Sequence, residues 1–504
     1  MIVRSRRIVL PDGVRPATIH IQDGTITRIG PYEDWSDVRD GRSAPEASAE
    51  RYDAGNLVVS PGIVDTHVHI NEPGRTDWEG FDTATRAAAA GGVTTVVDMP
   101  LNSVPATTTA AALEAKRTAA RGQCHVDVAF WGGVVPGNAA HLEALVEAGV
   151  RGFKCFLVPS GVDEFPAVDE RDLREALPIL SRRRVPLLVH AEAPALIQSP
   201  GLRSDRDSRV SALRQAQGRP EHRRGTARQA EAAYQTYLAT RPPEAEVDAI
   251  RMIARLAREF GACVHIVHVA SAEAADEVAC AKADGVAITA ETCPHYLTFA
   301  AEDVPDGATE FKCAPPVREA RHRAALWRAL ADGTLDLVAT DHSPAPPALK
   351  CPGDFMKAWG GIASLELSLA AVWTAREVSS ITSQLSESRS GQRPLSLEPS
   401  DLRLETSNLR VDLCSVAGWM SEAPARLAGL GDRKGRIAPG YDADLVVWDP
   451  DAAWTVDPSR LQQRHKVTPY AGRHLVGQVQ TTFLRGTPVW RDGRLIAVGS
   501  GDLL

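Results

Sequence analysis

The stretch IVDTHVHINEPGRTDWEGFDTATRAAAAGGVTTVVDMP, residues 63–100, decides the fold class of this chain. It begins with a short β-rich run, continues through an alanine-rich helical stretch and ends with a second β-rich run, VTTVVDMP. A strand, a helix and a strand in this order form a βαβ unit, whose two strands are parallel. The stretch therefore predicts a parallel sheet or a parallel barrel.

The same alternation continues to about residue 373. Runs that each predict a strand include HVDVAFWGG, VRGFKCFLV, VPLLVHAE, ACVHIVHVAS, GVAITAETC and LDLVATDHS, with helical stretches between several of them. Eight such units close a (β/α)8 barrel, the TIM barrel. We therefore predict an α/β protein whose catalytic barrel spans residues 61–436.

The two ends of the chain have a different pattern. Residues 1–60 and 437–504 carry short strands broken by turns, in which DG and RG mark hairpins. We predict that the two ends pair into one small β-sandwich domain. Two polar stretches, residues 203–228 and 378–408, are rich in Ser, Arg and Gln and poorly periodic, which predicts flexible surface insertions.

Composition and charge exclude several classes of function. The 504 residues are 44% hydrophobic and 24% charged with a formal net charge of -8, so the chain offers no basic field for nucleic acid. The amino terminus lacks the apolar core of a signal peptide, and no apolar run is long enough to span a bilayer. We expect a cytoplasmic enzyme without a membrane partner, whose eight cysteines are reduced.

Four histidines end β-rich runs. His67 and His69 lie two apart, so their side chains project from the same face of a strand and both imidazoles can reach one ion. His190 and His268 close two later apolar runs. A single buried histidine is usually a satisfied core residue, but functional residues of a barrel gather at the carboxyl ends of its strands. The set of four therefore favours one metal site.

Asp341 and Lys154 are charged residues in apolar runs. An ionised carboxylate at Asp341 needs a strong interaction to offset its burial. It could form a salt bridge, cap the next helix or bind a metal ion. Burial of Lys154 between Phe153 and Phe156 lowers the pKa of its amine and makes the amine nucleophilic, so that it can add carbon dioxide. The alternatives are a lysine that reaches solvent or pairs with a carboxylate.

These motifs resemble those of the cyclic amidohydrolases, the family of dihydroorotases, hydantoinases (dihydropyrimidinases) and allantoinases. The likeness covers nearly the whole chain apart from the two polar stretches. It is carried, in the family's order, by PGIVDTHVHINEPG, GFKCFLVPSGVDEFP, LLVHAE, IVHVAS, AETCPHYLTF, FKCAPPVRE, ATDHSP and KGRIAPGYDADLVVWD. The fold that this resemblance implies agrees with the barrel predicted from the alternation.

The resemblance also implies a cofactor and an assembly. Two divalent metal ions, expected to be Zn²⁺, would be held by His67, His69, Asp341 and Lys154 on one side and by Lys154, His190 and His268 on the other. Lys154 would be N6-carboxylysine, the carbamate formed with carbon dioxide. Asp341 would be the catalytic residue that takes the proton of a metal-bridging hydroxide and passes it to the leaving nitrogen. The family further implies a homotetramer.

The substrate is predicted from the residues beside these motifs. Dihydroorotases resemble this chain but carry an Arg and an Asn where it has Asn71 and Leu101, so a carboxylate-bearing substrate is disfavoured. The segments KCFLVPSGVDEFP and DHSPAPPALK lack the Tyr and the D-H-C end of hydantoinases and, with HINEPGRT and DMPLNSVP, look like the allantoinase branch. That resemblance implies hydrolysis of the ring amide of allantoin, a small neutral molecule, to allantoate.

Asn71, Cys313 and Ser343 are candidate substrate contacts, and each is as readily a structural turn residue. Three alternative functions stay open at this point. The first is a hydantoinase or dihydropyrimidinase that acts on another neutral ring. The second is a non-catalytic scaffold on the same fold, although such a scaffold typically has lost metal ligands. The third is a zinc hydrolase without a carbamate.

Overall fold

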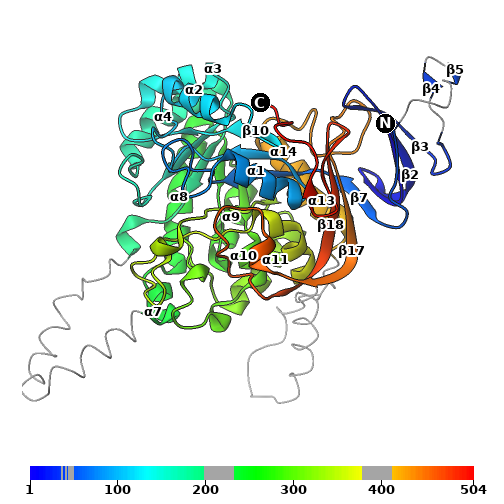
Figure 1. Ribbon diagram of the computed structural model, residues 1–504. Coiled ribbons are helices and arrows are strands. Elements are labelled where there is room, and N and C mark those ends of the chain that lie inside the picture. Colours follow the sequence, from blue (N-terminus) through cyan, green and yellow to red (C-terminus); the bar gives the residue numbers. More distant parts are fainter. Residues whose placement is uncertain (36–37, 40–41, 44–49, 198–231, 377–410) are drawn as a thin grey trace, which may run out of the picture.

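The computed structural model describes residues 1–504 except for 36–37, 40–41, 44–49, 198–231 and 377–410 (Figure 1). The two predicted surface insertions, residues 203–228 and 378–408, fall in the last two of these gaps and lie outside the described residues. Within the part of the chain that the structure describes, no helix is long and apolar enough to cross a membrane.

Parallel strands form a barrel in the larger part of the chain. Their hydrogen-bonded order is β10-β9-β8 in one sheet and β11-β12-β13-β14-β15-β16 in the other. They are β8 (Ile63–Val68), β9 (Val93–Asp98), β10 (Asp127–Phe130), β11 (Gly132–Gly133), β12 (Phe153–Phe156), β13 (Leu187–His190), β14 (Val264–Ile266), β15 (Ile288–Thr292) and β16 (Leu337–Val338).

The two sheets join into one closed barrel. Only Trp131 separates β10 from β11, so these two strands act as a single interrupted strand. At the other seam, the N–H of His69 donates to the carbonyl oxygen of His342 at 2.8 Å, which links the end of the last strand to the first. The (β/α)8 barrel predicted from the sequence is confirmed.

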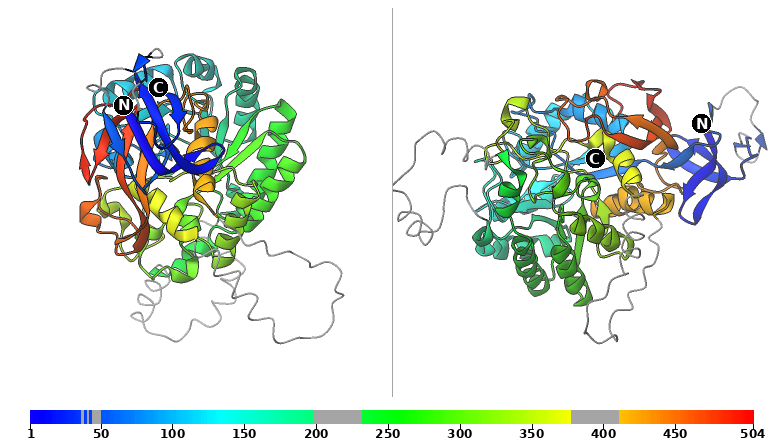
Figure 2. Two further views of the ribbon diagram at one scale, coloured as in Figure 1. Left: turned by 90° about the vertical axis from the view of Figure 1, so that its right-hand side faces the viewer. Right: turned by 90° about the horizontal axis from the view of Figure 1, so that it is seen from below.

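Helices surround the barrel (Figure 2). Helix α4 begins at the capping box of Asp169 and Asp172. Helix α8 buries Ile250 and Ile253 on one face and ends at Gly261, whose φ of 60° favours glycine. The longer helices are α1 (Phe81–Ala90), α2 (Ala110–Ala120), α4 (Glu170–Arg183), α8 (Pro243–Phe260), α9 (Ala272–Ala283) and α11 (Ala320–Ala331).

Shorter helices complete the ring and its loops. The α-helices among them are α3 (Leu142–Glu147), α7 (Tyr234–Ala239), α10 (Pro294–Thr298), α13 (Leu413–Ala417) and α14 (Ala423–Leu427). The 3₁₀ helices are η1 (Ala139–His141), η2 (Pro194–Leu196), η3 (Ala301–Asp303), η4 (Thr309–Phe311), η5 (Pro347–Lys350), η6 (Leu365–Leu367) and η8 (Pro458–Arg460), and η7 (Gly418–Glu422) is a π-helix.

Both ends of the chain lie in one nine-stranded sheet of order β20-β19-β18-β17-β7-β1-β2-β3, with β6 paired to β1 (Figure 1). Its strands are β1 (Ile2–Leu10), β2 (Gly13–Gln22), β3 (Thr25–Gly30), β6 (Arg51–Asp53), β7 (Val58–Pro61), β17 (Leu445–Thr455), β18 (His474–Leu484), β19 (Thr487–Arg491) and β20 (Arg494–Leu495). β4 (Val38–Arg39) and β5 (Arg42–Ser43) pair separately.

The antiparallel pairing of β7 with β17 joins the two chain ends, with Val59 opposite Val447. Both residues belong to a hydrophobic core of this sheet that is separate from the core of the barrel. The β-rich domain predicted from both ends of the chain is thus confirmed as part of the fold. The division of the chain at residues 60 and 437 stays a prediction.

Gly62 connects this sheet to the barrel directly. It lies between β7 and β8, and its N–H donates to the carbonyl oxygen of Asp444 at 2.8 Å. A Cβ atom at Gly62 would lie 2.3 Å from Oγ1 of Thr94, closer than atoms can approach. The missing side chain therefore lets the first barrel strand start against β9, which fixes where His67 and His69 emerge.

A buried lysine ties the barrel to the terminal sheet. Nζ of Lys434 lies 2.8 Å from Asp127 of β10, 2.6 Å from Asp444 and 3.1 Å from Asp442. Arg485, which follows β18, pairs with Asp127 at 2.6 Å. The pKa of Lys434 is raised because these carboxylates outweigh the cost of burying the ammonium. The ammonium thus lies between three carboxylates and supplies the positive charge that they need.

We expect Lys434→Met to lower the free energy of unfolding by about 3–5 kcal/mol, because it leaves buried carboxylates without their cation. Urea denaturation followed by circular dichroism measures the change. Arg121→Met is the control, since Arg121 pairs with Glu114 on the exposed surface and should contribute little. Equal stability of the two variants would contradict the role given to Lys434.

Candidate metal centre

The six predicted metal ligands come from five strands and their carboxyl ends. They are His67 in β8, His69 just after it, Lys154 in β12, His190 at the end of β13, His268 after β14 and Asp341 after β16. All six are buried. The carboxyl ends of the parallel strands lie on one face of the barrel, and these side chains therefore lie close together.

Two of these residues have an unusual backbone conformation. His268 has a φ of 44° and Asp341 a φ of 46°, both in the left-handed region. Such a conformation costs a side-chain-bearing residue about 1–3 kcal/mol and recurs at functional sites. The left-handed turn after each strand therefore costs free energy, which the surrounding fold must offset. It positions the polar side chain of His268 or Asp341 at the end of the strand.

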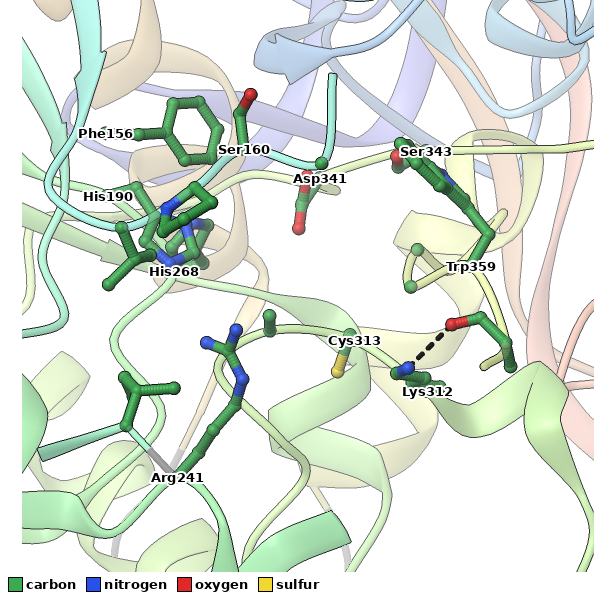
Figure 3. Close-up of a pocket in the computed structure, with 18 of the residues that line it drawn as sticks. Phe156, Ser160, His190, Arg241, His268, Lys312, Cys313, Asp341, Ser343 and Trp359 are labelled. Carbon is green, nitrogen blue, oxygen red and sulfur yellow. Dashed lines mark hydrogen bonds between the residues drawn. The ribbon is translucent and has the colours of Figure 1, made fainter. Parts of the chain in front are cut away.

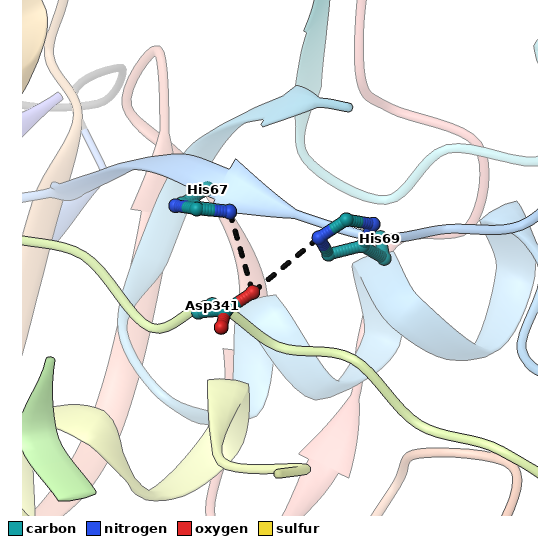
Figure 4. A group of neighbouring side chains, drawn as sticks. All are labelled: His67, His69 and Asp341. Atoms are coloured by element: carbon teal, nitrogen blue, oxygen red, sulfur yellow. Dashed lines mark ion pairs between the residues drawn. The ribbon is translucent and has the colours of Figure 1, made fainter. Parts of the chain in front are cut away.

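The first group of side chains is His67, His69 and Asp341 (Figure 4). Nε2 of His67 lies 3.2 Å and Nε2 of His69 3.3 Å from Oδ1 of Asp341. One ligand atom from each residue lies within 4.8 Å of the others. Two imidazole nitrogens and a carboxylate oxygen at such spacing suit one divalent cation.

The second group lies beside the first. The ring centroids of His190 and His268 are 4.6 Å apart, and that of His268 is 5.5 Å from that of His67. Nζ of Lys154 lies 4.7 Å from the centroid of the Phe156 ring and is fully buried. This amine has no hydrogen-bond partner among the described residues.

Burial sets the charge of the site. It lowers the pKa of Lys154 to about 8, because water no longer solvates the ammonium. It also lowers the pKa of His190 and of His268. Burial opposes ionisation of Asp341, but the neighbouring histidines outweigh it and hold the pKa of that carboxyl below its usual range. A neutral His190, a neutral His268 and an ionised Asp341 are the protonation states that metal binding requires.

The residues therefore fit a metal centre on two structural observations. Ligand atoms of His67, His69 and Asp341 converge without another cation between them among the described residues. The buried amine of Lys154 contacts the Phe156 ring but has no hydrogen-bond partner among the described residues. A buried polar group of this kind is costly unless a further group satisfies it.

A cavity of about 480 Å³ opens onto these side chains (Figure 3). The four histidines and Asp341 form part of its wall, together with residues such as Phe156, Arg241, Lys312 and Trp359. A volume of this size suits a small-molecule substrate.

The three predicted substrate contacts lie in different surroundings. Cys313 and Ser343 both line the cavity. Asn71 is buried and does not belong to its wall, and its Nδ2 lies 3.5 Å from the carbonyl oxygen of Pro344. Asn71 has a φ of 68° and no partner for Oδ1 among the described residues.

Three charged residues of the site were missed in the sequence. Glu192 and Glu291 are fully buried and contact ring nitrogens of His190 and His67, and Arg241 pairs with Glu192. The signal that identified Lys154, a charge within an apolar strand, was also present at Glu291 in GVAITAETC. Glu192 likewise ends the predicted strand run VPLLVHAE, whereas Arg241 lies outside the apolar runs and had no such signal.

A closed parallel barrel whose strand ends bring histidines, a carboxylate and a buried lysine to one cavity defines a metal-dependent hydrolase. The model of the amidohydrolase family matches residues 58–489. The chain belongs to the amidohydrolase family, a metal-dependent family of hydrolases. The predicted resemblance to this family is confirmed.

Several relatives match over nearly the whole chain. The allantoinase of Streptomyces avermitilis is 45% identical, over 98% of this chain and 96% of its own. The allantoinases of Arabidopsis thaliana and Saccharomyces cerevisiae are each 38% identical, over 99% and 97% of this chain and 90% and 95% of theirs. Among solved structures, the L-hydantoinase of Arthrobacter aurescens has a TM-score of 0.79 at 29% identity, covering 100% of this chain and 98% of its own.

We expect Asp341→Asn to weaken binding of one metal ion by more than about 100-fold, since loss of a ligand should exceed the cost of losing an outer partner. Zinc content after dialysis against a chelator, measured by mass spectrometry, reports the loss. Ser343→Ala is the control, because Ser343 lines the same cavity without belonging to the ligand set. Wild-type zinc content in Asp341→Asn would exclude Asp341 as a ligand.

Proposed function

We propose that the protein hydrolyses the ring amide of allantoin to allantoate. The observation that carries this proposal is the convergence of four histidines and Asp341 on one small cavity, with the buried amine of Lys154 beside Phe156 of its wall, in a chain whose full-length relatives are allantoinases. Hydrolysis of an unactivated amide needs a nucleophile at neutral pH and a polarised carbonyl. A pair of divalent ions bound here would supply both.

The residues divide into two ligand groups in this proposal. His67, His69 and Asp341 would hold one ion, His190 and His268 would hold the other, and a carboxylated Lys154 would serve both. Zinc is the proposed metal, since imidazole and carboxylate ligands suit it. The close approach of the three ligand atoms in the first group supports the assignment.

Carboxylation of Lys154 follows from its surroundings. Its buried amine, with a pKa lowered to about 8, has a substantial neutral fraction that can attack carbon dioxide. The nitrogen forms a bond to the carbon and loses a proton, which leaves a carbamate with one negative charge and two oxygens. That anion would offer a charged ligand to both cations and would offset part of their charge, and its formation would remove the cost of the unpartnered amine.

Asp341 is the proposed proton carrier. Its Oδ1 faces His67 and His69, and the residue lines the cavity where the substrate ring must lie. We propose that Asp341 accepts the proton of the attacking water and passes it to the leaving ring nitrogen. Cys313 and Ser343 are proposed to contact the ring from the cavity wall, and Asn71 to support that wall through the loop at Pro344.

The charge of the cavity supports a neutral substrate. Arg241 pairs with Glu192, and Nζ of Lys312 donates to the carbonyl oxygens of Ala358 and Met356 at 2.6 and 3.3 Å. These two cations of the cavity wall are therefore already engaged. A substrate with its own carboxylate would have to compete with those contacts.

The finer expectations from the family are proposed here as well. We propose a homotetramer located in the cytoplasm, on the basis of the resemblance alone. Light scattering coupled to size-exclusion chromatography tests the assembly, and a mass other than that of four chains would contradict it.

We expect metal-dependent hydrolysis of allantoin in preference to hydantoin, dihydrouracil and dihydroorotate. The four rings are assayed side by side with protein reconstituted with zinc and bicarbonate, and a metal-stripped sample is the control. Preference for hydantoin or dihydrouracil would instead indicate a hydantoinase, the activity named for the similar solved structures. No activity on any ring at full metal content would contradict the proposal.

We expect Lys154→Ala to lose activity, because the variant cannot form the carbamate that would serve both cations. A short carboxylic acid added to the variant should restore part of the activity by replacing the carbamate. Incorporation of ¹³C-bicarbonate into the wild-type protein, detected as a carbamate resonance, checks the modification directly. Full activity of the unrescued variant would support a zinc hydrolase without a carbamate.

A further inference from the structure

Two buried glutamates contact the predicted ligands and take no part in the proposed reaction. Oε2 of Glu192 lies 2.6 Å from Nε2 of His190, and Oε1 of Glu291 lies 2.5 Å from Nδ1 of His67. Both glutamates are fully buried. A carboxylate only accepts hydrogen bonds, so in each pair the histidine nitrogen carries the hydrogen.

The two contacts select opposite ring nitrogens. A neutral imidazole carries one hydrogen, and its other nitrogen has the lone pair that can bind a metal. His190 must therefore present Nδ1 and His67 must present Nε2. At His67 the geometry agrees independently, because Nε2 is the atom that lies 3.2 Å from Asp341.

Each carboxylate has a second partner, on the same oxygen in Glu192 and on the other oxygen in Glu291. Arg241, just after α7, donates through Nη1 to Oε2 of Glu192. Oε2 of Glu291 lies 3.1 Å from Nε2 of His265, whose Nδ1 lies 2.7 Å from Oγ1 of Thr289. These outer partners keep the carboxylates from turning away from the histidines.

The ring of His190 has one further restraint. Phe156 stacks on it with a centroid distance of 4.8 Å and an interplanar angle of 19°. Stacking fixes the plane of the ring but not which nitrogen faces the cavity, since a half-turn about the Cβ–Cγ bond leaves the plane unchanged. Only a directional contact such as that of Glu192 distinguishes the two orientations.

We propose that Glu192 and Glu291 are positioning residues of the metal centre, which fix His190 with Nδ1 and His67 with Nε2 toward the bound ions. The inference rests on the proposed function, because it requires that these histidines bind metal. Outer partners of ligand histidines typically contribute 10–100-fold to metal affinity, about the size of effect expected here.

The test compares alanine and glutamine variants at each position. Glu192→Ala and Glu291→Ala remove the acceptor, whereas the glutamine variants keep the side-chain length and one acceptor oxygen. Asp127→Asn is the matched control, because Asp127 is also a fully buried carboxylate paired with cations but lies at the amino end of β10. Circular dichroism establishes which variants fold.

Zinc affinity is measured by competition with a chromophoric chelator, and the absorption spectrum of the cobalt-loaded protein reports ligand geometry. We expect each alanine variant to bind one of the two ions about 10–100-fold more weakly and to have an altered cobalt spectrum. The zinc affinity and cobalt spectrum of each glutamine variant should be closer to those of the wild type. Asp127→Asn should keep both affinities while it loses thermal stability.

The outcomes separate the two proposals. If the wild-type protein does not bind two ions, the proposed metal centre itself is wrong. If the wild type binds two ions and folded alanine variants bind both with wild-type affinity, the positioning role is overturned. Where an alanine variant does not fold, the glutamine variant decides, because unchanged affinity together with an unchanged cobalt spectrum contradicts the role.

Discussion

The hydrogen bonds that join His67 and His69 to His342 close the barrel and bring the two halves of the first ligand group together. The N–H of His69 donates to His342, and the N–H of His342 donates to the carbonyl oxygen of His67 at 3.2 Å. Because Asp341 immediately precedes His342, this seam places its carboxylate beside both imidazoles. Closure of the fold and assembly of the site are therefore the same event.

Charge within the barrel is balanced locally. Glu192 is matched by Arg241 and His190, and Glu291 by His67 and His265. At the opposite end of the barrel, Lys434 is surrounded by carboxylates. These networks satisfy buried ions that would each cost several kcal/mol if left alone, as the general penalty for unpaired charges implies.

Lys154 departs from that pattern, since its amine is buried without a hydrogen-bond partner among the described residues. This buried amine thus lies where the sequence motifs and the family both point to chemistry. A buried amine without a hydrogen-bond partner beside converging ligands is what a modifiable metal ligand requires. The cations of the cavity wall, in contrast, are already engaged, which leaves room for a neutral ring.

The sequence by itself determined the barrel, the pairing of the chain ends and the candidate ligands. Alternating β-rich and helical runs predict parallel strands. Polar residues that end apolar runs, such as His190 and Asp341, are identified as candidate ligands by their position in the sequence. The tertiary structure decided the rest. Glu192 and Arg241 contact each other across 49 positions, and Asn71 lies outside the cavity wall despite its place beside His69. Such contacts depend on how strands and loops pack in space, which periodicity along a chain does not encode.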